Sequence, residues 1–148
     1  MISSDIWAVA IVISAYKTRT STKVLLTMKT ILCVDDSTTV LLSLTAILTK
    51  AGFAAEKAIS GDEGLSKLKG ALKPDLIITD LNMPGMNGIE FIKQVRLLPN
   101  LKFVPILFLT TESQQSKRME AKAAGASGWL VKPVNGEELL GTIKLVMR

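Results

Sequence analysis

The sequence predicts an α/β fold built on one parallel sheet of five strands. Short apolar segments alternate along the chain with longer segments whose apolar residues recur at helical spacing. The short segments lack polar alternation, which is typical of strands buried on both faces. Crossovers between parallel strands are almost always right-handed. With 148 residues, of which 48% are apolar and 21% charged, the chain fits a single globular domain.

Five short apolar segments are the predicted strands. All are bounded by turn residues or by residues that favour helix starts, and the second is the most polar of the five. Each precedes a helical pattern, as expected for repeated strand–helix units. The strands are predicted at 30–34 (TILCV), 54–59 (AAEKAI), 76–79 (LIIT), 104–109 (VPILFL) and 128–131 (GWLV).

Five amphipathic segments are the predicted helices. Ser37 is a suitable N-cap for the first helix, which ends at Gly52. Asn135 followed three residues later by Glu138 is a typical start for the last helix. The helices between them are predicted at 62–69, at 88–98, where Pro99 stops the helix, and at 113–124, where Gly125 ends it.

The composition excludes several kinds of chemistry. The chain has no histidine, so Ser-His-Asp and Cys-His catalysis and His-ligated zinc are ruled out, and any metal must be a hard cation held by oxygen. Cys33 is the one cysteine and is expected to be a buried small hydrophobe in a reducing compartment, the cytoplasm. The net charge is +5 without a basic run interleaved with aromatics, so no nucleic-acid binding is expected.

Residues 1–27 differ from the rest of the chain. An apolar run of 11 residues at 6–16 is too short for a membrane span, which needs about 20. Asp5 precedes this run and Lys17 and Arg19 follow it, which is the reverse of a signal peptide. We expect an extension outside the fold, no membrane insertion, and a folded domain at 28–148. A helix that binds a membrane or a partner is the alternative.

Charged and hydroxyl side chains follow four of the predicted strands. Asp35 and Asp36 follow the first strand, Asp80 the third, Thr110 the fourth and Lys132 the fifth. Because the carboxyl ends of parallel strands meet at one edge of the sheet, we expect these side chains to converge. Any one of them alone fits a turn or a helix cap equally well, but all together at one edge indicate a site.

The predicted group suits phosphoryl chemistry. Clustered carboxylates repel one another, and Mg²⁺, which prefers oxygen ligands, would relieve the repulsion. Lys132 and Thr110 can bind phosphate oxygens, and Asp80 can act as a carboxylate nucleophile on phosphorus. Stabilisation by a metal and a lysine is typical of phosphoryl transfer.

Four motifs carry a family resemblance: VDDS (34–37), DLNMPGMNG (80–88), PILFLTTE (105–112) and GASGWLVKP (125–133). Residues 28–148 resemble the receiver domain of two-component response regulators, and closely the single-domain chemotaxis regulators of the CheY-like type. The resemblance implies a flavodoxin-like (βα)5 fold, a doubly wound sheet with helices on both faces.

The resemblance also implies roles for the residues at the sheet edge. Asp80 would be the phosphoacceptor. Asp35, Asp36 and Asp80 would hold Mg²⁺ together with the backbone carbonyl of Asn82. Lys132 would contact the phosphoryl group.

Further positions match the switch of this family. Thr110 would be the switch hydroxyl and Trp129 the aromatic switch residue, where the family more often has Tyr or Phe. Asn82 and Glu112 would set the lifetime of the phosphate. The Lys132–Pro133 bond is expected to be cis.

Gly88 lies where the loop after Pro84 turns tightly, and we expect its freedom at positive φ to be needed there.

The implied function is a signalling switch and not an enzyme. A histidine kinase or histidine phosphotransfer protein would be the donor, and a target protein, such as a flagellar motor switch, would bind the face formed by the fourth helix, fifth strand and fifth helix. Lys117, Arg118 and Lys122 make the fourth helix basic, which fits either a solvated face or an acidic partner.

Two other functions stay open at this point. A phosphorelay intermediate or phosphate sink would use the same chemistry. A Mg²⁺-dependent phosphohydrolase with an aspartate nucleophile is more remote. Such enzymes place Asp-x-Asp after the first strand, whereas here the triplet at 80–82 is Asp-Leu-Asn and follows the third strand.

Overall fold

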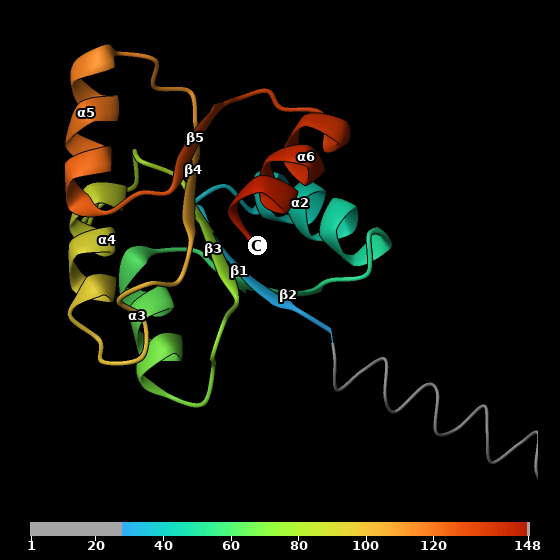
Figure 1. Ribbon diagram of the computed structural model, residues 1–148, viewed down its shortest axis with the longest axis horizontal. Coiled ribbons are helices and arrows are strands. Elements are labelled where there is room, and N and C mark those ends of the chain that lie inside the picture. Colours follow the sequence, from blue (N-terminus) through green and yellow to red (C-terminus); the bar gives the residue numbers. More distant parts are fainter. Residues whose placement is uncertain (1–27, 148) are drawn as a thin grey trace, which may run out of the picture.

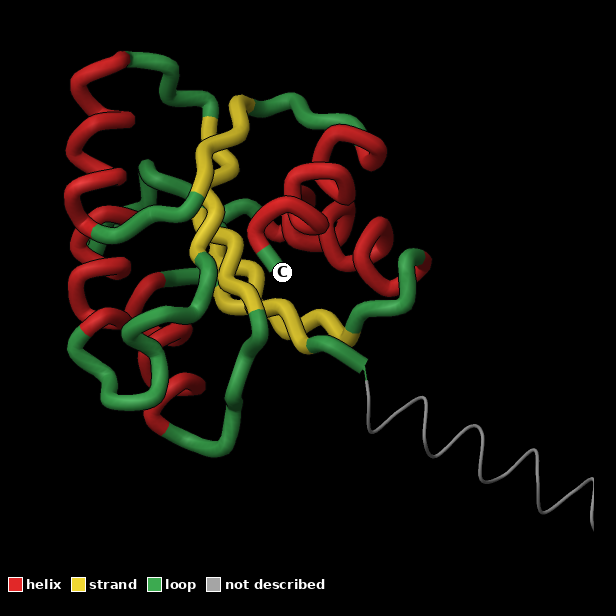
Figure 2. Tube along the Cα trace, viewed as in Figure 1, coloured by secondary structure: helices red, strands yellow, loops and turns green. Residues whose placement is uncertain are grey.

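The fold is a central parallel sheet with helices on both sides, seen in a computed structural model that describes residues 28–147 (Figures 1 and 2). The strand order is β2-β1-β3-β4-β5 with every neighbouring pair parallel, which confirms the predicted α/β class and doubly wound (βα)5 arrangement. The predicted extension at 1–27 lies outside the described residues. The elements are β1 (Thr30–Val34), α2 (Thr38–Lys50), β2 (Ala54–Ala58), α3 (Gly61–Lys69), β3 (Leu76–Thr79), α4 (Gly88–Arg96), β4 (Ile106–Thr110), α5 (Gln115–Ala124), β5 (Gly128–Val131) and α6 (Gly136–Val146).

Two apolar layers hold the helices onto the sheet. Helices α2 and α6 cover one face, and α3, α4 and α5 cover the other (Figure 1). Successive residues of β1 divide between the layers: Ile31 and Cys33 pack toward α2 and α6, while Leu32 and Val34 pack toward the other helices. Both faces of β1 are therefore buried, as its continuous apolar sequence predicts.

Cys33 is fully buried, as predicted for a small hydrophobe in a strand. Burial, with a smaller contribution from the nearby charge of Asp35, raises the pKa of its thiol to about 12. The thiol therefore stays protonated at neutral pH.

Side-chain caps start four of the five helices in the described chain. Ser37 accepts from the Val40 amide, and Asn135 accepts from the Glu138 amide, so both predicted caps are confirmed. Ser60 and Asn87 cap α3 and α4 in the same way. Helix α5 has no side-chain cap and begins at Gln115, two residues later than predicted.

Two boundaries shift because of proline. Strand β4 covers Ile106–Thr110 rather than 104–109, because Pro105 has no N–H to donate to the ladder. Helix α4 ends at Arg96 rather than at 98, and the amides of Leu97 and Leu98 bond three residues back, to Gln94 and Val95. This tightening leads into Pro99, since the residue before a proline disfavours the α conformation.

None of the helices in the described part of the chain has both the length and the apolar character needed to cross a membrane.

Candidate functional site

The register of β1 and β3 brings two carboxylates together at the point where the strand order reverses. Val34 pairs with Thr79, so the next residues, Asp35 and Asp80, leave the sheet side by side. The amide of Asp80 donates to the Val34 carbonyl at 2.9 Å, which extends the ladder by one bond. Ligands of doubly wound folds bind at this type of switch point.

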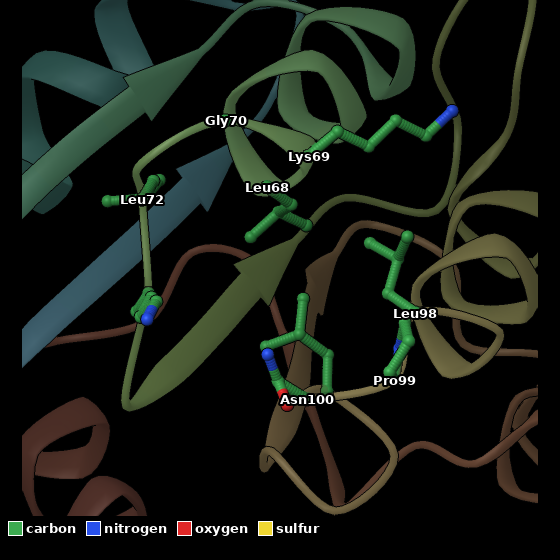
Figure 3. A pocket seen from close by; sticks show the side chains of 9 residues that line it. Leu68, Lys69, Gly70, Leu72, Leu98, Pro99 and Asn100 are labelled. Carbon is green, nitrogen blue, oxygen red and sulfur yellow. The ribbon is translucent and has the colours of Figure 1, made fainter.

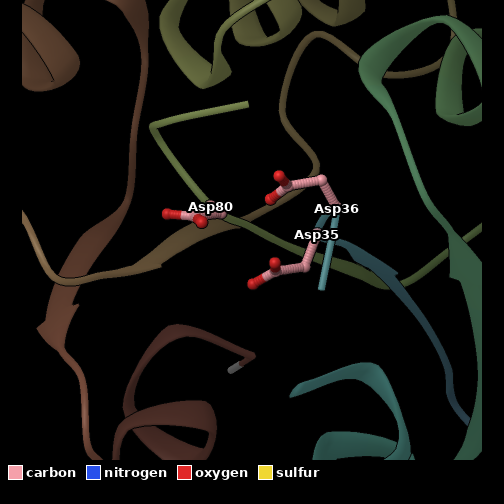
Figure 4. A group of neighbouring side chains, drawn as sticks. All are labelled: Asp35, Asp36 and Asp80. Atoms are coloured by element: carbon pink, nitrogen blue, oxygen red, sulfur yellow. The ribbon is translucent and has the colours of Figure 1, made fainter. Parts of the chain in front are cut away.

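Asp36 joins these two acids to form a cluster of three (Figure 4). One carboxylate oxygen from each of Asp35, Asp36 and Asp80 lies within 4.8 Å of the others. Asp35 and Asp80 are only 2% and 8% exposed, whereas Asp36 is exposed. The cluster therefore has a buried floor and a side open to solvent.

Lys132 reaches two of the three carboxylates. Its Nζ donates to Asp35 Oδ2 at 2.6 Å and to Asp80 Oδ2 at 3.2 Å. Its backbone amide donates to the Thr110 carbonyl at 2.8 Å, and the following bond to Pro133 is cis, as predicted. The residue that follows β5 thus places one ammonium group, that of Lys132, beside the cluster of three acids.

The surroundings of this ion pair raise the pKa of both Asp35 and Lys132. Burial raises the pKa of Asp35, and the hydrogen bonds from Lys132 and from the Ser37 amide only partly offset this. Burial lowers the pKa of Lys132, but its hydrogen bonds and charge interactions with Asp35 and Asp80 outweigh burial and raise it overall. Both raised pKa values favour the protonated forms of the two side chains.

Asp80 is held in one orientation. Its Oδ1 accepts from the Leu81 amide at 2.7 Å, while its Oδ2 faces Lys132. The side chain is 10% exposed, so only a small part of it is open to solvent. The strand and the loop together present one carboxylate to an approaching group.

Gly88 is needed for a different reason from the one predicted. Its φ is not positive; in this loop the positive φ belongs to Gly85, at 75°. A Cβ at Gly88 would lie 2.2 Å from the Asp80 carbonyl oxygen and 2.6 Å from Phe108. The expectation of positive φ at Gly88 is therefore wrong, and the close approach of α4 to the backbone of Asp80 explains the glycine.

The remaining predicted site residues lie around the acidic cluster. Thr110 is fully buried at the end of β4, and its Oγ1 accepts from the Glu112 amide at 3.2 Å. The Glu112 carboxylate accepts from the Gln114 amide at 3.1 Å. Asn82 is exposed in the loop after β3. Their roles in switching and phosphate lifetime stay predictions.

Trp129 packs across β5 and β4 onto Phe108. The two rings are 5.3 Å apart and inclined by 41°, and the Arg118 guanidinium lies 5.8 Å from the centre of the indole. The Trp129 Nε1 is buried without a hydrogen-bond partner. The indole is therefore packed in the protein while its N–H has no acceptor. The switch role of Trp129 stays a prediction.

The donor set fits Mg²⁺. Asp35, Asp36 and Asp80 supply only carboxylate oxygens, the exposed side leaves room for water ligands, and hard cations prefer such a set. The three acids would hold the ion, and the part of the Asn82 backbone carbonyl stays a prediction.

Two supporting groups escaped the sequence analysis. The Ser37 amide donates to Asp35 Oδ1 at 2.9 Å, and the Leu81 amide orients Asp80. Aspartate side chains often accept from the backbone amide two residues later in a turn, so the first contact carries a weak sequence signal. The second depends on loop geometry and carries none.

The comparisons with known proteins agree with this geometry. The family model of the response regulator receiver domain matches residues 31–144. The chain belongs to this family of two-component signalling domains. Protein PilH of Pseudomonas aeruginosa is 38% identical over 120 residues, which cover 81% of this chain and 98% of PilH. Chemotaxis protein CheY of Thermotoga maritima is 37% identical over 122 residues, again 81% of this chain and 98% of the relative.

A solved structure of a receiver domain matches as well. Chemotaxis protein CheY4 of Vibrio cholerae superposes with a TM-score of 0.78 and is 48% identical, covering 80% of this chain and 98% of CheY4. The chain is thus similar in sequence and fold to single-domain receivers that bear chemotaxis names.

Proposed function

We propose that this receiver domain is a phosphorylation-dependent protein switch of a two-component system, acting in the cytoplasm in chemotaxis or motility control. The observation that carries the proposal is the buried Asp80 carboxylate beside Lys132, 3.2 Å away, in a cluster of three acids. The donor is a histidine kinase or a histidine phosphotransfer protein. The sequence contains no histidine, so none of its own residues can form the phosphohistidine.

In the transfer step an Asp80 carboxylate oxygen forms a bond to phosphorus as the bond from phosphorus to the donor's imidazole nitrogen breaks. The electron pair of the broken bond returns to that imidazole. Mg²⁺, when bound, supplies positive charge that screens the acids and the transferred group. Lys132, held between Asp35 and Asp80, offers its ammonium to a phosphoryl oxygen.

The output begins at Thr110. Its hydroxyl oxygen accepts from the Glu112 amide, and its O–H turns to donate to a phosphoryl oxygen, so that the end of β4 moves with it. Trp129, packed against Phe108 two residues before Thr110, repacks toward the space that Thr110 leaves. The charge of the phosphoryl group on Asp80 thereby shifts the equilibrium between two arrangements of Thr110 and Trp129.

The repacked face is formed by α5, β5 and α6, and it binds the target, with a flagellar motor switch as the candidate. Lys122 is exposed on α5, and Arg118 lies against Trp129. Lys117 is already paired with Glu120 at 3.3 Å. An acidic partner segment would complement the two remaining cations. The domain works as a switch and not as an enzyme on external substrates.

The test is transfer of labelled phosphate from a panel of autophosphorylated histidine kinases and phosphotransfer proteins. We expect the wild-type chain and Asp62→Asn, an exposed acid on α3, to be labelled, and Asp80→Asn to stay unlabelled. Label that moves on to a second phosphotransfer protein would replace the output role with that of a phosphorelay intermediate. Steady release of phosphate from p-nitrophenyl phosphate would indicate the phosphohydrolase instead.

A further inference from the structure

A hollow with an apolar floor lies at the end of the sheet opposite Asp80. It is enclosed by the end of α3 and by the connection from α4 to β4, and we call it the α3–α4 hollow (Figure 3). The segments around it lead into β3 and β4, whereas Asp80 follows β3, so the strands separate the hollow from the acidic cluster. Leucines supply the apolar lining and two exposed lysines the polar lining: Leu68, Leu72, Leu98, Leu101, Lys69 and Lys73.

The size of the α3–α4 hollow suits a side chain better than a whole cofactor. Its volume is about 270 Å³. Small-molecule sites typically have about 300–1,000 Å³ and enclose most of their ligand. The hollow is therefore more like the pocket on a protein surface that receives an apolar side chain of a partner.

The charge around the hollow is positive and has no counterpart in the fold. The segments 66–75 and 93–105 contain one acid, Asp75, and its carboxylate accepts from the Thr30 amide at 2.8 Å. The exposed lysines of these segments, none of which forms an ion pair within residues 28–147, are Lys69, Lys73, Lys93 and Lys102. A patch of one sign attracts groups of the opposite sign.

The helix dipole accounts for only part of this charge. Lys69 and Lys93 lie in the last turns of α3 and α4, where a cation is favourable. Lys73 and Lys102 belong to no helix. Lysines alone would fit an ordinary solvated surface, so the argument for a partner depends on the apolar groups beside them.

Phe103 is the most prominent of these apolar groups. Its side chain is 95% exposed. Arg96 Nη1 donates to the carbonyls of Leu101 and Val104, which flank Phe103, at 2.9 and 2.7 Å. The Nη2 of the same guanidinium donates to the Gly125 carbonyl at 2.7 Å. The backbone that carries the phenyl ring is thus fixed before any partner arrives, which lowers the entropy lost on binding.

The exposed apolar groups adjoin the hollow along the chain. Leu97, 73% exposed, precedes Leu98 of the lining, and Phe103 comes two residues after Leu101 of the lining. Apolar surface that is recessed in this way can be covered by a protruding side chain, whereas the headgroup region of a membrane presents no such projection. The combination of recess, aromatic group and lysines therefore favours a protein partner.

We propose that the α3–α4 hollow and Phe103 form a docking surface for an acidic segment of a partner protein. An apolar side chain of that segment enters the hollow, and its carboxylates face the lysines. Phe103 packs against the same segment. Because Asp80 lies at the opposite end of the strands, docking here does not require a phosphoryl group and leaves the face formed by α5, β5 and α6 open.

The test is fluorescence anisotropy of a labelled synthetic peptide in which leucines recur at helical spacing among glutamates. Titration with the full chain should show binding at low salt that high salt weakens, and no binding when lysines replace the glutamates. Lys69→Glu/Lys73→Glu should bind at least about tenfold more weakly. The control Lys57→Glu/Lys144→Glu has the same net charge, at exposed sites on β2 and α6, and should bind like wild type.

A second pair of variants tests the apolar contact. Phe103→Ser should bind the peptide about tenfold more weakly, because an aromatic side chain is no longer buried on binding. Leu42→Ser, at a site 61% exposed on α2, should bind like wild type. Acetyl phosphate with Mg²⁺ should leave the affinity of wild type unchanged. Circular dichroism melts of each variant confirm that the fold is intact.

Several results would overturn the proposal. Wild type that leaves the glutamate–leucine peptide free at low salt would exclude an acidic segment, and sedimentation with phosphatidylglycerol vesicles in that case would make a lipid surface the occupant. Equal binding by Lys69→Glu/Lys73→Glu or by Phe103→Ser would place the peptide elsewhere, as on α5. An affinity changed by acetyl phosphate would place it on the face that responds to Asp80. A dimer in sedimentation velocity, lost only in Phe103→Ser, would make a second copy the occupant.

Discussion

A single methyl group added at position 88 should disturb the backbone that carries Asp80. In Gly88→Ala the new Cβ would lie 2.2 Å from the Asp80 carbonyl oxygen, 2.9 Å from Leu81 Cα and 2.6 Å from Phe108 Cε1. Two of these atoms are backbone, and Phe108 is fully buried, so no flexible side-chain end can yield. Moving α4 away would break the bond from the Gly88 amide to the Leu81 carbonyl, 2.8 Å long.

The cost of Gly88→Ala follows from these contacts. Overpacking a well-packed site costs about 1–3 kcal/mol, and this clash belongs at the upper end because backbone must move. Gly88 is the first residue of α4, so the preference of a helix interior for alanine offsets little of this loss. We expect the free energy of unfolding to fall by about 2 kcal/mol, measured by urea denaturation, and Tm to fall by roughly 8 °C.

Gly141→Ala is the matched control, because Gly141 is exposed within α6 and its Cβ would meet nothing within 4 Å. It should raise the free energy of unfolding by about 0.5–1 kcal/mol. If Gly88→Ala were as stable as wild type, the close approach of α4 to Asp80 would not be the reason for the glycine.

Three further changes test other parts of the structure. Arg96→Ala removes bonds to the carbonyls of Leu101, Val104 and Gly125 at 2.9, 2.7 and 2.7 Å, so urea denaturation should show a loss of about 2–3 kcal/mol, against less than about 0.5 for the exposed Lys93→Ala. An equal effect of the two variants would show that the hydrogen bonds of Arg96 to these three carbonyls do not stabilise the fold. Native Cys33, with its pKa raised by burial to about 12, should resist Ellman's reagent until guanidinium is added. Because the unfolded thiol ionises near its ordinary pKa of 9.0 and the folded one does not, wild type should lose stability relative to Cys33→Ala as pH rises through 9; parallel stability curves would refute this. Lys132→Met should bind Mg²⁺ about threefold to tenfold more tightly by calorimetry, because its ammonium competes for Asp35 and Asp80; weaker binding would show that the lysine does not compete.

The order of the elements was predictable because it depends on local periodicity. The strand at 30–34 and the caps at Ser37 and Asn135 are encoded within a few neighbouring residues. The meeting of Asp35 and Asp80 was also predictable, since a parallel sheet brings the carboxyl ends of its strands to one edge.

Other features depend on distances between remote segments, which periodicity does not contain. The clash that forbids a side chain at Gly88 involves Phe108, twenty residues away. Arg96 ties α4 to Gly125, and the indole of Trp129 is left without a partner for its Nε1. Strand β4 begins two residues later than predicted because Pro105 has no backbone N–H. This effect is local, but the continuous apolar run VPILFL outweighed it in the prediction.

The role assigned to Asp80 is decided by the intact mass of the full chain after incubation with acetyl phosphate and Mg²⁺. Wild type and Asp62→Asn should each gain one phosphoryl group, and Asp80→Asn should gain none. No gain in folded, Mg²⁺-bound wild type, or an equal gain in Asp80→Asn, would contradict Asp80 as the phosphoacceptor.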